Sequence, residues 1–516
     1  MIAVAPIVYA LAVIILRVPA IESKVVVLLS VPHTANVRTH TNVGRALAAL
    51  GHQPYVLIPQ FMLHENKANI DGINVIAYGG YLGDYEEMLA GKLVEAFWQG
   101  ESRLYTHMSE FSRVLQETAR LILSDRDLQQ KLAAIKPDLF VLSHVPPFKN
   151  IVILPYIFNA SFVLLSPFND LLGYRVPVSL AATPCQGIGT ISQESFLDRL
   201  KTAACHAAIM VLGLISGNDT MVAEFAPHRP QVSVNELALQ AEIYLVEGDH
   251  VLDFAKPELP NMKLIGCTAP TTGKPLQDPF KSFVEGSKRG VAVVTFGSSV
   301  VNIPSKVADM MAEAFEQQEL DVVWRVNYTS LNPGKVFTSQ WIPQNDILAH
   351  PNTRLFVSHC GANGQYEALY HGIPMLCLPL LGDQNYNAQR STAKGFGLHA
   401  NILELSASHL ANLMKEVSGN TKYQSNIKKA SILFRQLYKE PHKMAAFWID
   451  HVMEYGGTYM RSAGQNMPLY KFLALDVLAV VSLVIFTNIL VLYCVCRCLW
   501  RKCCGKQTGA KKDKND

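Results

Sequence analysis

One segment near the C-terminus restricts the fold of this chain more than any other. Residues Val477–Cys496 form a run of 20 residues without a charged side chain. Such a run can cross the hydrocarbon core of a membrane, which is about 30 Å thick. Seven Lys and Arg residues against two Asp follow it, and positive charge marks the cytoplasmic flank of a span. We therefore expect a transmembrane helix at 475–496 and a cytoplasmic tail at 497–516.

The N-terminus predicts how the rest of the chain reaches the opposite side of the membrane. Residues 1–16 carry no charge, and the small-residue stretch Val18-Pro19-Ala20 follows, so we expect a secretory signal peptide at 1–20. Five cysteines lie between these two apolar ends, and from so small and odd a number no disulfide framework follows, so the disulfides stay open. Three sequons become available for N-glycosylation in that compartment, at Asn159, Asn218 and Asn327.

The composition excludes several classes of protein. Hydrophobic residues make up 49% of the chain and charged residues 17%, which excludes a disordered or coiled-coil chain. The net charge of +3 gives no electrostatic support for binding nucleic acid. A single-pass adhesion receptor would need repeated β modules or a disulfide framework, and the sequence indicates neither.

Two stretches in which strands and helices alternate predict two doubly wound, parallel α/β domains. In the first, strands at Val25–Val31 and Gln53–Ile58 flank a helical stretch at Asn42–Leu50. In the second, strands at Gly290–Phe296 and Asp321–Arg325 do the same, and a proline-rich segment separates the two. Two such domains imply a cleft, because ligands bind beyond the carboxyl ends of parallel strands. The expected boundaries are an N-terminal domain at 21–265, a linker at 266–289 and a C-terminal domain at 290–470.

The segment 341–384 carries the clearest chemistry. A strand at Leu355–Ser358 leads into His359, and a glycine-containing turn then opens a helix. The backbone N–H groups and the positive dipole end at such a turn bind a diphosphate. Other residues of this segment suit the rest of a nucleotide sugar: Trp341 offers a flat face to a base, Glu367 can accept two hydroxyls, and Asp383 and Gln384 can reach a polyol.

This segment resembles the nucleotide-sugar signature of the UDP-glycosyltransferases. The resemblance covers most of the chain and includes Gly51-His52, Asn261–Gly266, Thr295–Ser298 and Phe447–Ile449. Asn363-Gly364 is similar to the animal membrane-bound branch, the UDP-glucuronosyltransferase type. The resemblance implies a GT-B fold, in which two Rossmann-like domains face a cleft. It further implies an N-terminal domain that binds the acceptor and a C-terminal domain that binds the UDP-sugar.

The resemblance also implies a reaction and a role for each residue of the donor site. The reaction is inverting transfer of a sugar, glucuronic acid or possibly glucose, from a UDP-sugar to a small lipophilic acceptor, without a metal or cofactor. The implied donor site consists of Trp341 and Gln344 at uracil, Glu367 at the ribose, Ser298, His359, Gly361, Asn363 and Gly364 at the diphosphate, and Asp383 and Gln384 at the sugar.

The catalytic residues depart from the family pattern. The family places its histidine base roughly fifteen residues before the Gly-His pair, and here that position is Asn36, which cannot act as a base. We expect His33 to be the base if this turn is three residues longer, and His40 to support it. The family's partner aspartate falls at Ser143, which cannot balance the charge of an imidazolium. Two hypotheses follow: an active transferase, or a weak or inactive family member that binds UDP-sugar or modulates partner enzymes.

Two short motifs have their own interpretations. Asp125-Arg-Asp127 has the form of a metal motif, but its position at a predicted helix start favours capping. Lys512 and Lys514 occupy the fifth and third positions from the carboxyl end and resemble the dilysine signal that retrieves type I proteins to the endoplasmic reticulum. We therefore expect a protein of that membrane with lumenal catalytic domains. Homo-oligomers are possible, and the acceptor stays open.

Overall fold

The computed structural model describes the greater part of the chain, which divides into two compact units. The first unit ends at Arg461 and the second begins at Ser462. The predicted signal peptide at 1–20 and the lysines Lys512 and Lys514 lie outside the described residues. The described residues are 23–64, 70, 72–80, 85–100, 104–167, 169–185, 195–298 and 300–504.

The first sheet is parallel, with the strand order β3-β2-β1-β4-β5-β6-β7. Its centre is built from apolar runs buried on both faces, and Val26–Leu29 pairs with Leu139–Leu142. The order reverses between β1 and β4, which makes their carboxyl ends a ligand-binding switch point. The strands are β1 (Val25–Leu29), β2 (Gln53–Pro59), β3 (Asn74–Tyr78), β4 (Leu139–Ser143), β5 (Ser161–Ser166), β6 (Tyr244–Val246) and β7 (Met262–Leu264).

The second sheet is also parallel, with the order β10-β9-β8-β11-β12-β13. Its order reverses between β8 and β11, so a second switch point lies at their carboxyl ends. The strands are β8 (Val291–Thr295), β9 (Asp321–Arg325), β10 (Val336–Ser339), β11 (Thr353–Ser358), β12 (Met375–Cys377) and β13 (Gly397–His399). The two doubly wound sheets predicted from the sequence are therefore confirmed.

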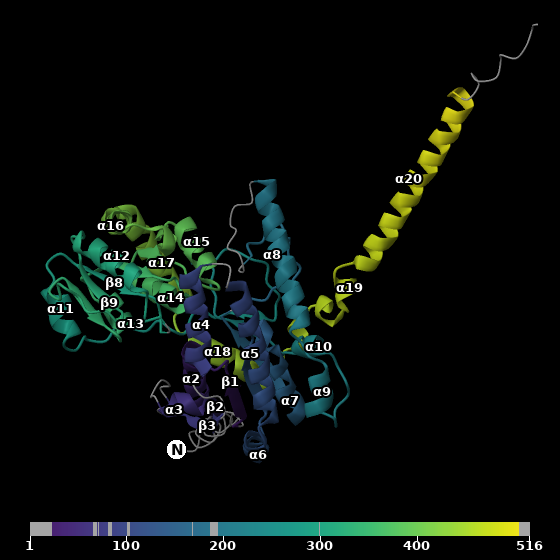
Figure 1. Ribbon diagram of the computed structural model, residues 1–516. Helices are drawn as coiled ribbons and strands as arrows, with labels where there is room; N and C mark the ends of the chain where they lie inside the picture. The colour runs from purple at the N-terminus through teal and green to yellow at the C-terminus, as the bar shows by residue number, and fades with distance from the viewer. Residues whose placement is uncertain are drawn as a thin grey trace, which may run out of the picture. The chain divides into compact units, whose positions relative to one another are not determined.

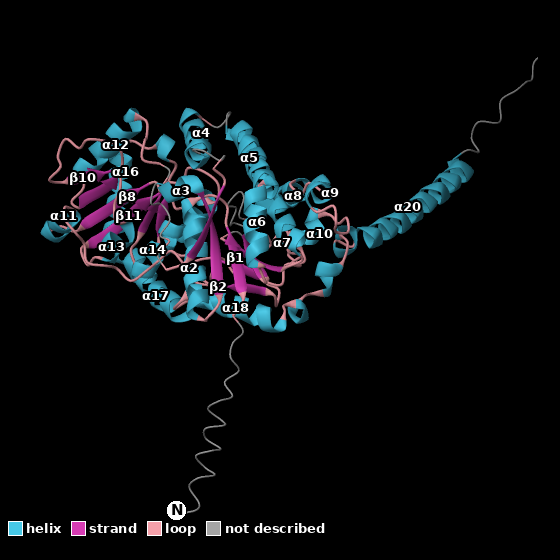
Figure 2. Ribbon diagram, turned by 90° about the horizontal axis from the view of Figure 1, so that it is seen from below, coloured by secondary structure: helices cyan, strands magenta, loops and turns pink. Residues whose placement is uncertain are grey.

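Helices cover both faces of each sheet, as the cyan and magenta elements of Figure 2 show. On the first sheet, one face packs on α2 (Thr34–Ala49), α3 (Gln60–His64) and α18 (Pro441–Tyr455), and the other on α5 (Leu104–Ser124), α6 (Arg126–Ile135), η2 (Pro146–Val152), α7 (Ile153–Phe158), α9 (Thr220–Phe225) and α10 (Val234–Ala238). On the second sheet, one face packs on α12 (Ser305–Glu316) and α16 (Ala407–Gly419), and the other on α11 (Phe280–Gly286), α13 (Gln344–Ala349), α14 (Ala362–His371) and α17 (Thr421–Leu437).

Three segments depart from the sequence-based expectations. Helix α2 begins at Thr34, well before the expected Asn42, because His33 caps its N-terminus. Helix α11 forms inside the predicted linker. Helix α18 follows the second sheet in sequence but packs against α2 of the first half, and His52 Nε2 lies 2.9 Å from Asp450 Oδ1.

The structure contains two disulfides among the described residues, a point that the sequence leaves open. Cys185 is bonded to Cys205 and Cys360 to Cys377, and Cys267 is a buried free thiol, which accounts for the odd number. Pairing depends on which cysteines the fold brings together, and a count along the sequence does not carry that information.

Two helical stretches of the described residues are long and apolar enough to cross a membrane, Phe196–Phe225 and Leu475–Cys503. The first contains α8 (Phe196–Ile215), which is fixed to the first unit by the Cys185–Cys205 disulfide and by the Lys149 Nζ to Gly213 carbonyl bond of 2.9 Å. The second is α20 (Leu475–Cys504) of the second unit, labelled with α19 (Leu469–Phe472) in Figure 1. It is the candidate span that the sequence predicts.

Candidate active site

The switch point of the second sheet brings two glycine-containing turns together around His359. Gly297 follows β8, and Gly361 lies between β11 and α14. A Cβ atom at Gly297 would lie 2.7 Å from His359 Nε2, and one at Gly361 would lie 2.6 Å from it. Gly297 also has φ +86, a conformation that side chains rarely adopt. Both glycines are therefore required for the histidine to sit at the start of α14.

Arg325 supports these turns and was missed by the sequence analysis. It ends β9, and its guanidinium donates to the Gly297 carbonyl and to the Ser298 carbonyl, the latter at 3.2 Å. Burial, together with the Arg325 charge, lowers the pKa of His359 to about 4. His359 is therefore neutral at pH 7, and its Nδ1 is buried without a hydrogen-bond partner among the described residues. The sequence signal that could have identified Arg325 is its position. It is the last residue of β9, and β9 is the strand next to β8.

Glu367 and Gln344 form a buried pair where the resemblance implies the ribose. Glu367 lies on α14 and is 5% exposed, and Gln344 Nε2 donates to its Oε2 at 2.6 Å. Burial raises the pKa of Glu367 to about 7, although the Gln344 hydrogen bond and the Arg38 charge oppose the rise. Just before α13, Trp341 is 65% exposed, so one face of the indole is open to a flat ligand.

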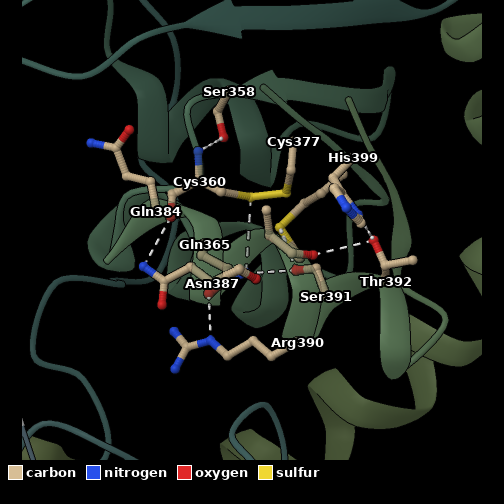
Figure 3. Close-up of a disulfide and its surroundings, with 12 residues drawn as sticks. Ser358, Cys360, Gln365, Cys377, Gln384, Asn387, Arg390, Ser391, Thr392 and His399 are labelled. Carbon is tan, nitrogen blue, oxygen red and sulfur yellow. Dashed lines mark hydrogen bonds between the residues drawn. A yellow bond between two sulfur atoms is a disulfide. The ribbon is translucent and has the colours of Figure 1, made fainter. Parts of the chain in front are cut away.

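Helix α15 (Gln384–Ala393) presents the two residues implied at the sugar. Asp383 is its N-cap, and Asn387 Nδ2 donates to Asp383 Oδ2 at 2.8 Å and to the Cys360 carbonyl at 3.0 Å. The Cys360–Cys377 disulfide of Figure 3 joins the loop after β11 to the last residue of β12, beside these residues. Gln384 Oε1 accepts the N–H groups of Leu380 and Leu381, which fixes the side chain by its oxygen.

The remaining residues of the implied diphosphate site also lie around the start of α14. Ser298 is exposed on the turn after β8. Asn363 lies in the first turn of α14, and its Oδ1 accepts from Cys267 Sγ at 3.7 Å. Gly364 lies against Gln344, whose Nε2 would be 3.3 Å from a Cβ at that position. The implied donor residues therefore follow the carboxyl ends of β8, β10, β11 and β12.

His33 lies at the switch point of the first sheet, but its ring is engaged as a helix cap. Its Nδ1 accepts the N–H of Ala35 at 3.3 Å. A neutral imidazole that accepts at Nδ1 carries its proton on Nε2, which then donates. In this arrangement His33 cannot take a proton at Nε2, so it must give up the capping bond to act as a base.

The other sequence candidates near this switch point are buried. His40 lies in the second turn of α2, and its Nδ1 donates to the Asn36 carbonyl at 3.0 Å. Burial lowers the pKa of His40 to about 4, so it is neutral at pH 7. Ser143 ends β4, and its buried Oγ has no hydrogen-bond partner among the described residues. Asp138, the residue just before β4, is engaged elsewhere, since its Oδ2 accepts the Val25 N–H at 2.7 Å.

A histidine–aspartate pair directly after Ser143 was not predicted. His144 Nε2 lies 3.0 Å from Asp170 Oδ2, and both side chains are buried. Burial would raise the pKa of Asp170, but His144 and Lys149 hold it below its usual range. Asp170 is thus an ionised carboxylate that contacts His144, the residue next to the position where the resemblance implies the family's acid. The available signal in the sequence was that His144 directly follows the end of a strand. Its partner Asp170 could not be found in this way, because it lies 26 positions away.

The Asp125 motif is a helix cap, as predicted. Asp125 is the N-cap of α6, and its Oδ1 accepts the Leu128 N–H at 3.0 Å. Asp127 lies in the first turn and pairs with Lys131 at 2.6 Å. Among the described residues, no group of three or more His, Cys, Asp or Glu side chains is placed to hold a metal ion.

Solved structures share this architecture at low sequence identity. Os79 from O. sativa, in complex with U2F and trichothecene, aligns with a TM-score of 0.60 and 16% identity over 83% of this chain and 100% of that chain. The calicheamicin glycosyltransferase CalG4 aligns with a TM-score of 0.56 and 15% identity over 84% of this chain and 99% of that one. The two sheets with their paired switch points thus have the GT-B fold.

Sequence comparison gives the family. The family model "UDP-glucoronosyl and UDP-glucosyl transferase" matches residues 25–510. UDP-glucuronosyltransferase 1A5 of Homo sapiens is 31% identical over 484 residues, or 91% of this chain and 90% of that protein. UDP-glucuronosyltransferase 1-2 of Mus musculus is 28% identical over 495 residues. The chain belongs to the UDP-glycosyltransferase family and is of the animal UDP-glucuronosyltransferase type.

Proposed function

We propose that this enzyme transfers glucuronic acid from UDP-glucuronic acid to a hydroxyl or similar group of a small lipophilic acceptor. The observation that carries the proposal is the set of donor residues at one switch point, with Glu367 and Gln344 paired and His359 between two glycine turns. The preference for glucuronic acid over glucose comes from the relatives, which are glucuronosyltransferases by name.

Each part of the site has a task in this reaction. The exposed indole of Trp341 stacks on uracil, and Glu367 accepts hydrogen bonds from the ribose hydroxyls. The diphosphate lies at the N-terminus of α14, where backbone N–H groups and the helix dipole favour negative charge. As the sugar leaves, the charge that develops on the diphosphate is stabilised there and by Arg325 behind the turn.

The acceptor's proton goes to His33 in this proposal. The imidazole lies after β1 at the switch point of the first half, and it becomes a base at Nε2 once Nδ1 no longer accepts the Ala35 N–H. The second hypothesis, a weak transferase that chiefly binds UDP-sugar, is favoured by that capping bond and by Ser143 at the acid position. The two differ in turnover and agree on donor binding.

The cellular location is part of the proposal. The apolar helix α20 and its basic flank support a type I protein anchored in the endoplasmic reticulum membrane, with the catalytic half in the lumen. Asn159, Asn218 and Asn327 are all exposed, as glycan acceptors must be.

The test uses membranes that contain the full chain. Rates of acceptor-dependent UDP release are compared for UDP-glucuronic acid, UDP-glucose and UDP-N-acetylglucosamine, with one phenolic acceptor. The proposal expects the fastest release with UDP-glucuronic acid. Faster release with UDP-glucose would move the enzyme to the glucosyl branch, and donor binding without acceptor-dependent release would favour the second hypothesis.

A further inference from the structure

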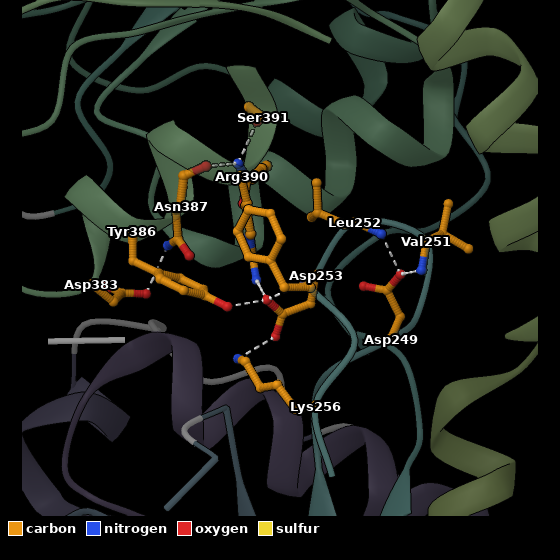
Figure 4. Close-up of polar contacts among 12 residues, drawn as sticks. Asp249, Val251, Leu252, Asp253, Lys256, Asp383, Tyr386, Asn387, Arg390 and Ser391 are labelled. Carbon is orange, nitrogen blue, oxygen red and sulfur yellow. Dashed lines mark hydrogen bonds and ion pairs between the residues drawn. The ribbon is translucent and has the colours of Figure 1, made fainter. Parts of the chain in front are cut away.

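A loop of the N-terminal half reaches both helices of the donor site. Residues 247–256 follow β6 and carry three buried carboxylates, Glu247, Asp249 and Asp253, of which the last two contact those helices. Asp249 Oδ2 accepts the hydroxyl of Tyr366 on α14 at 2.6 Å, and Asp253 Oδ1 accepts the hydroxyl of Tyr386 on α15. Figure 4 shows the Asp253 contacts beside the residues of α15. The loop thus contacts each donor helix through one carboxylate and one buried tyrosine.

Buried cations complete this contact. Arg390 of α15 has NH1 3.8 Å from Asp253 Oδ1, and Lys256 Nζ lies 2.9 Å from Asp253 Oδ2. Burial would raise the pKa of Asp253, but Lys256 and Arg390 hold it below its usual range. Asp253 is therefore a fixed anion between two cations, and such a buried group tolerates little displacement.

Hydrogen bonds extend from Arg390 to the sugar end of α15. Arg390 Nε donates to Gln365 Oε1 at 2.8 Å, and Gln365 Nε2 donates to the Asn387 carbonyl at 2.7 Å. Asn387 Nδ2 in turn holds Asp383 Oδ2 at 2.8 Å. A continuous series of contacts therefore runs from Asp253 in the N-terminal half to Asp383 in the donor site.

We infer that this group, the donor clamp, positions Asp383 for the sugar of the donor and leaves the uridine end alone. The donor clamp consists of Asp253, Lys256, Tyr386 and Arg390. Its members are positioning residues, because they act on the sugar through Asn387 and Asp383. The inference rests on the proposed function, which assigns Asp383 to the sugar. Trp341 and Gln344, at the uridine end, make none of these contacts.

The alternative is that the donor clamp only holds the two halves together. A purely structural interface predicts lower thermal stability in every clamp variant, with affinities for UDP and for UDP-glucuronic acid falling together. A positioning role predicts that the two affinities separate, because only one ligand carries the sugar.

The experiment compares Tyr386→Phe and Asp253→Asn with wild type in the full chain in detergent. Tyr386→Phe removes one hydroxyl and keeps the packing. This variant therefore still tests the inference if Asp253→Asn fails to fold. The matched control is Asp321→Asn, which breaks the Arg289–Asp321 ion pair of 2.9 Å. This pair lies in the C-terminal half, as Tyr386 does, but away from the donor residues. Calorimetry gives the dissociation constants for UDP and UDP-glucuronic acid, and turnover gives KM and kcat.

We expect UDP affinity to change by less than about twofold in both clamp variants, while affinity for UDP-glucuronic acid or kcat falls about tenfold or more, as misplaced sugar contacts require. Asp321→Asn should match wild type in both. An unchanged ratio of the two affinities, with unchanged kcat, in folded Tyr386→Phe and Asp253→Asn would overturn the inference.

Asp383→Ala separates this inference from the proposed function. If Asp383→Ala loses use of the sugar and the clamp variants do not, the inference alone fails. If Asp383→Ala has no effect, the assignment of Asp383 fails and the inference fails with it. If wild type shows no turnover, the proposed transfer fails, and the two affinities still decide whether the donor clamp positions the sugar site.

Discussion

The buried carboxyl of Glu367 makes donor binding depend on pH in a direction that can be worked out. Its pKa is about 7 in the unliganded protein, raised by burial. The ionised carboxylate accepts hydrogen bonds from both ribose hydroxyls, whereas the protonated form is a poorer acceptor. A bound donor therefore selects the ionised form, and binding must weaken as the pH falls below 7 and Glu367 takes up its proton.

The magnitude follows from the pKa. If the bound form is ionised throughout, the dissociation constant scales with the inverse of the ionised fraction in the free protein. With a pKa of about 7, that fraction is about one tenth at pH 6 and about nine tenths at pH 8. The dissociation constant should therefore be about tenfold larger at pH 6 than at pH 8, or about 1.4 kcal/mol.

Calorimetry with UDP-glucuronic acid is the suitable assay, because its esterified diphosphate and its carboxylate do not titrate between these two pH values. His359, with its pKa near 4, also keeps one state across this range. The control is Glu367→Gln, which should bind about 1–3 kcal/mol more weakly at pH 8 and show no pH dependence. A wild-type constant that changes less than twofold, or a Glu367→Gln variant with the same slope as wild type, would refute the assignment of Glu367 to the ribose.

Three further predictions follow from the site and the tail. His33→Ala should lower kcat by about 10²–10⁴ with UDP affinity unchanged, as measured by turnover and calorimetry; if His40→Ala does this and His33→Ala does not, the choice of base is wrong. Arg325→Ala should weaken UDP binding by about 1.5–3 kcal/mol, because the charged bond to the Ser298 turn is lost; unchanged affinity in calorimetry would exclude Arg325 from the donor site. Replacing Lys512 and Lys514 with Ser should move the protein to the cell surface with endoglycosidase H-resistant glycans; glycans that stay sensitive would argue against these lysines as the sole retention device.

The local pattern of apolar residues predicted the central strands of each sheet well. The strand at Asp321–Arg325 lies where the sequence places it, and β1 differs from its prediction only at its end, because apolar β-branched runs buried on both faces leave few alternatives. The start of α2 was missed, since a histidine cap at His33 gives a weaker signal than Ser, Thr, Asp or Asn.

Contacts between distant parts of the chain could not be predicted from the sequence. Arg325 acts on Gly297 across neighbouring strands, and Asp253 meets Tyr386 from the other half of the chain. That the implied donor residues of segment 341–384 lie near one another was predictable, because they follow successive strands of one parallel sheet. Their roles stay a prediction. The acid–base residues come from separate loops of the first half, where neither spacing nor periodicity fixes their partners.

The central claim is that this chain transfers the sugar from a UDP-sugar to an acceptor, and a product balance tests it most directly. The full chain in membranes is incubated with UDP-glucuronic acid and a phenol, and UDP and the glycoside are quantified together, with the anomeric configuration read by proton NMR. The account predicts UDP and β-glucuronide in equal amounts, both absent without the phenol. Bound UDP-glucuronic acid with no glycoside formed, or a product that retains the donor's α configuration, would contradict it.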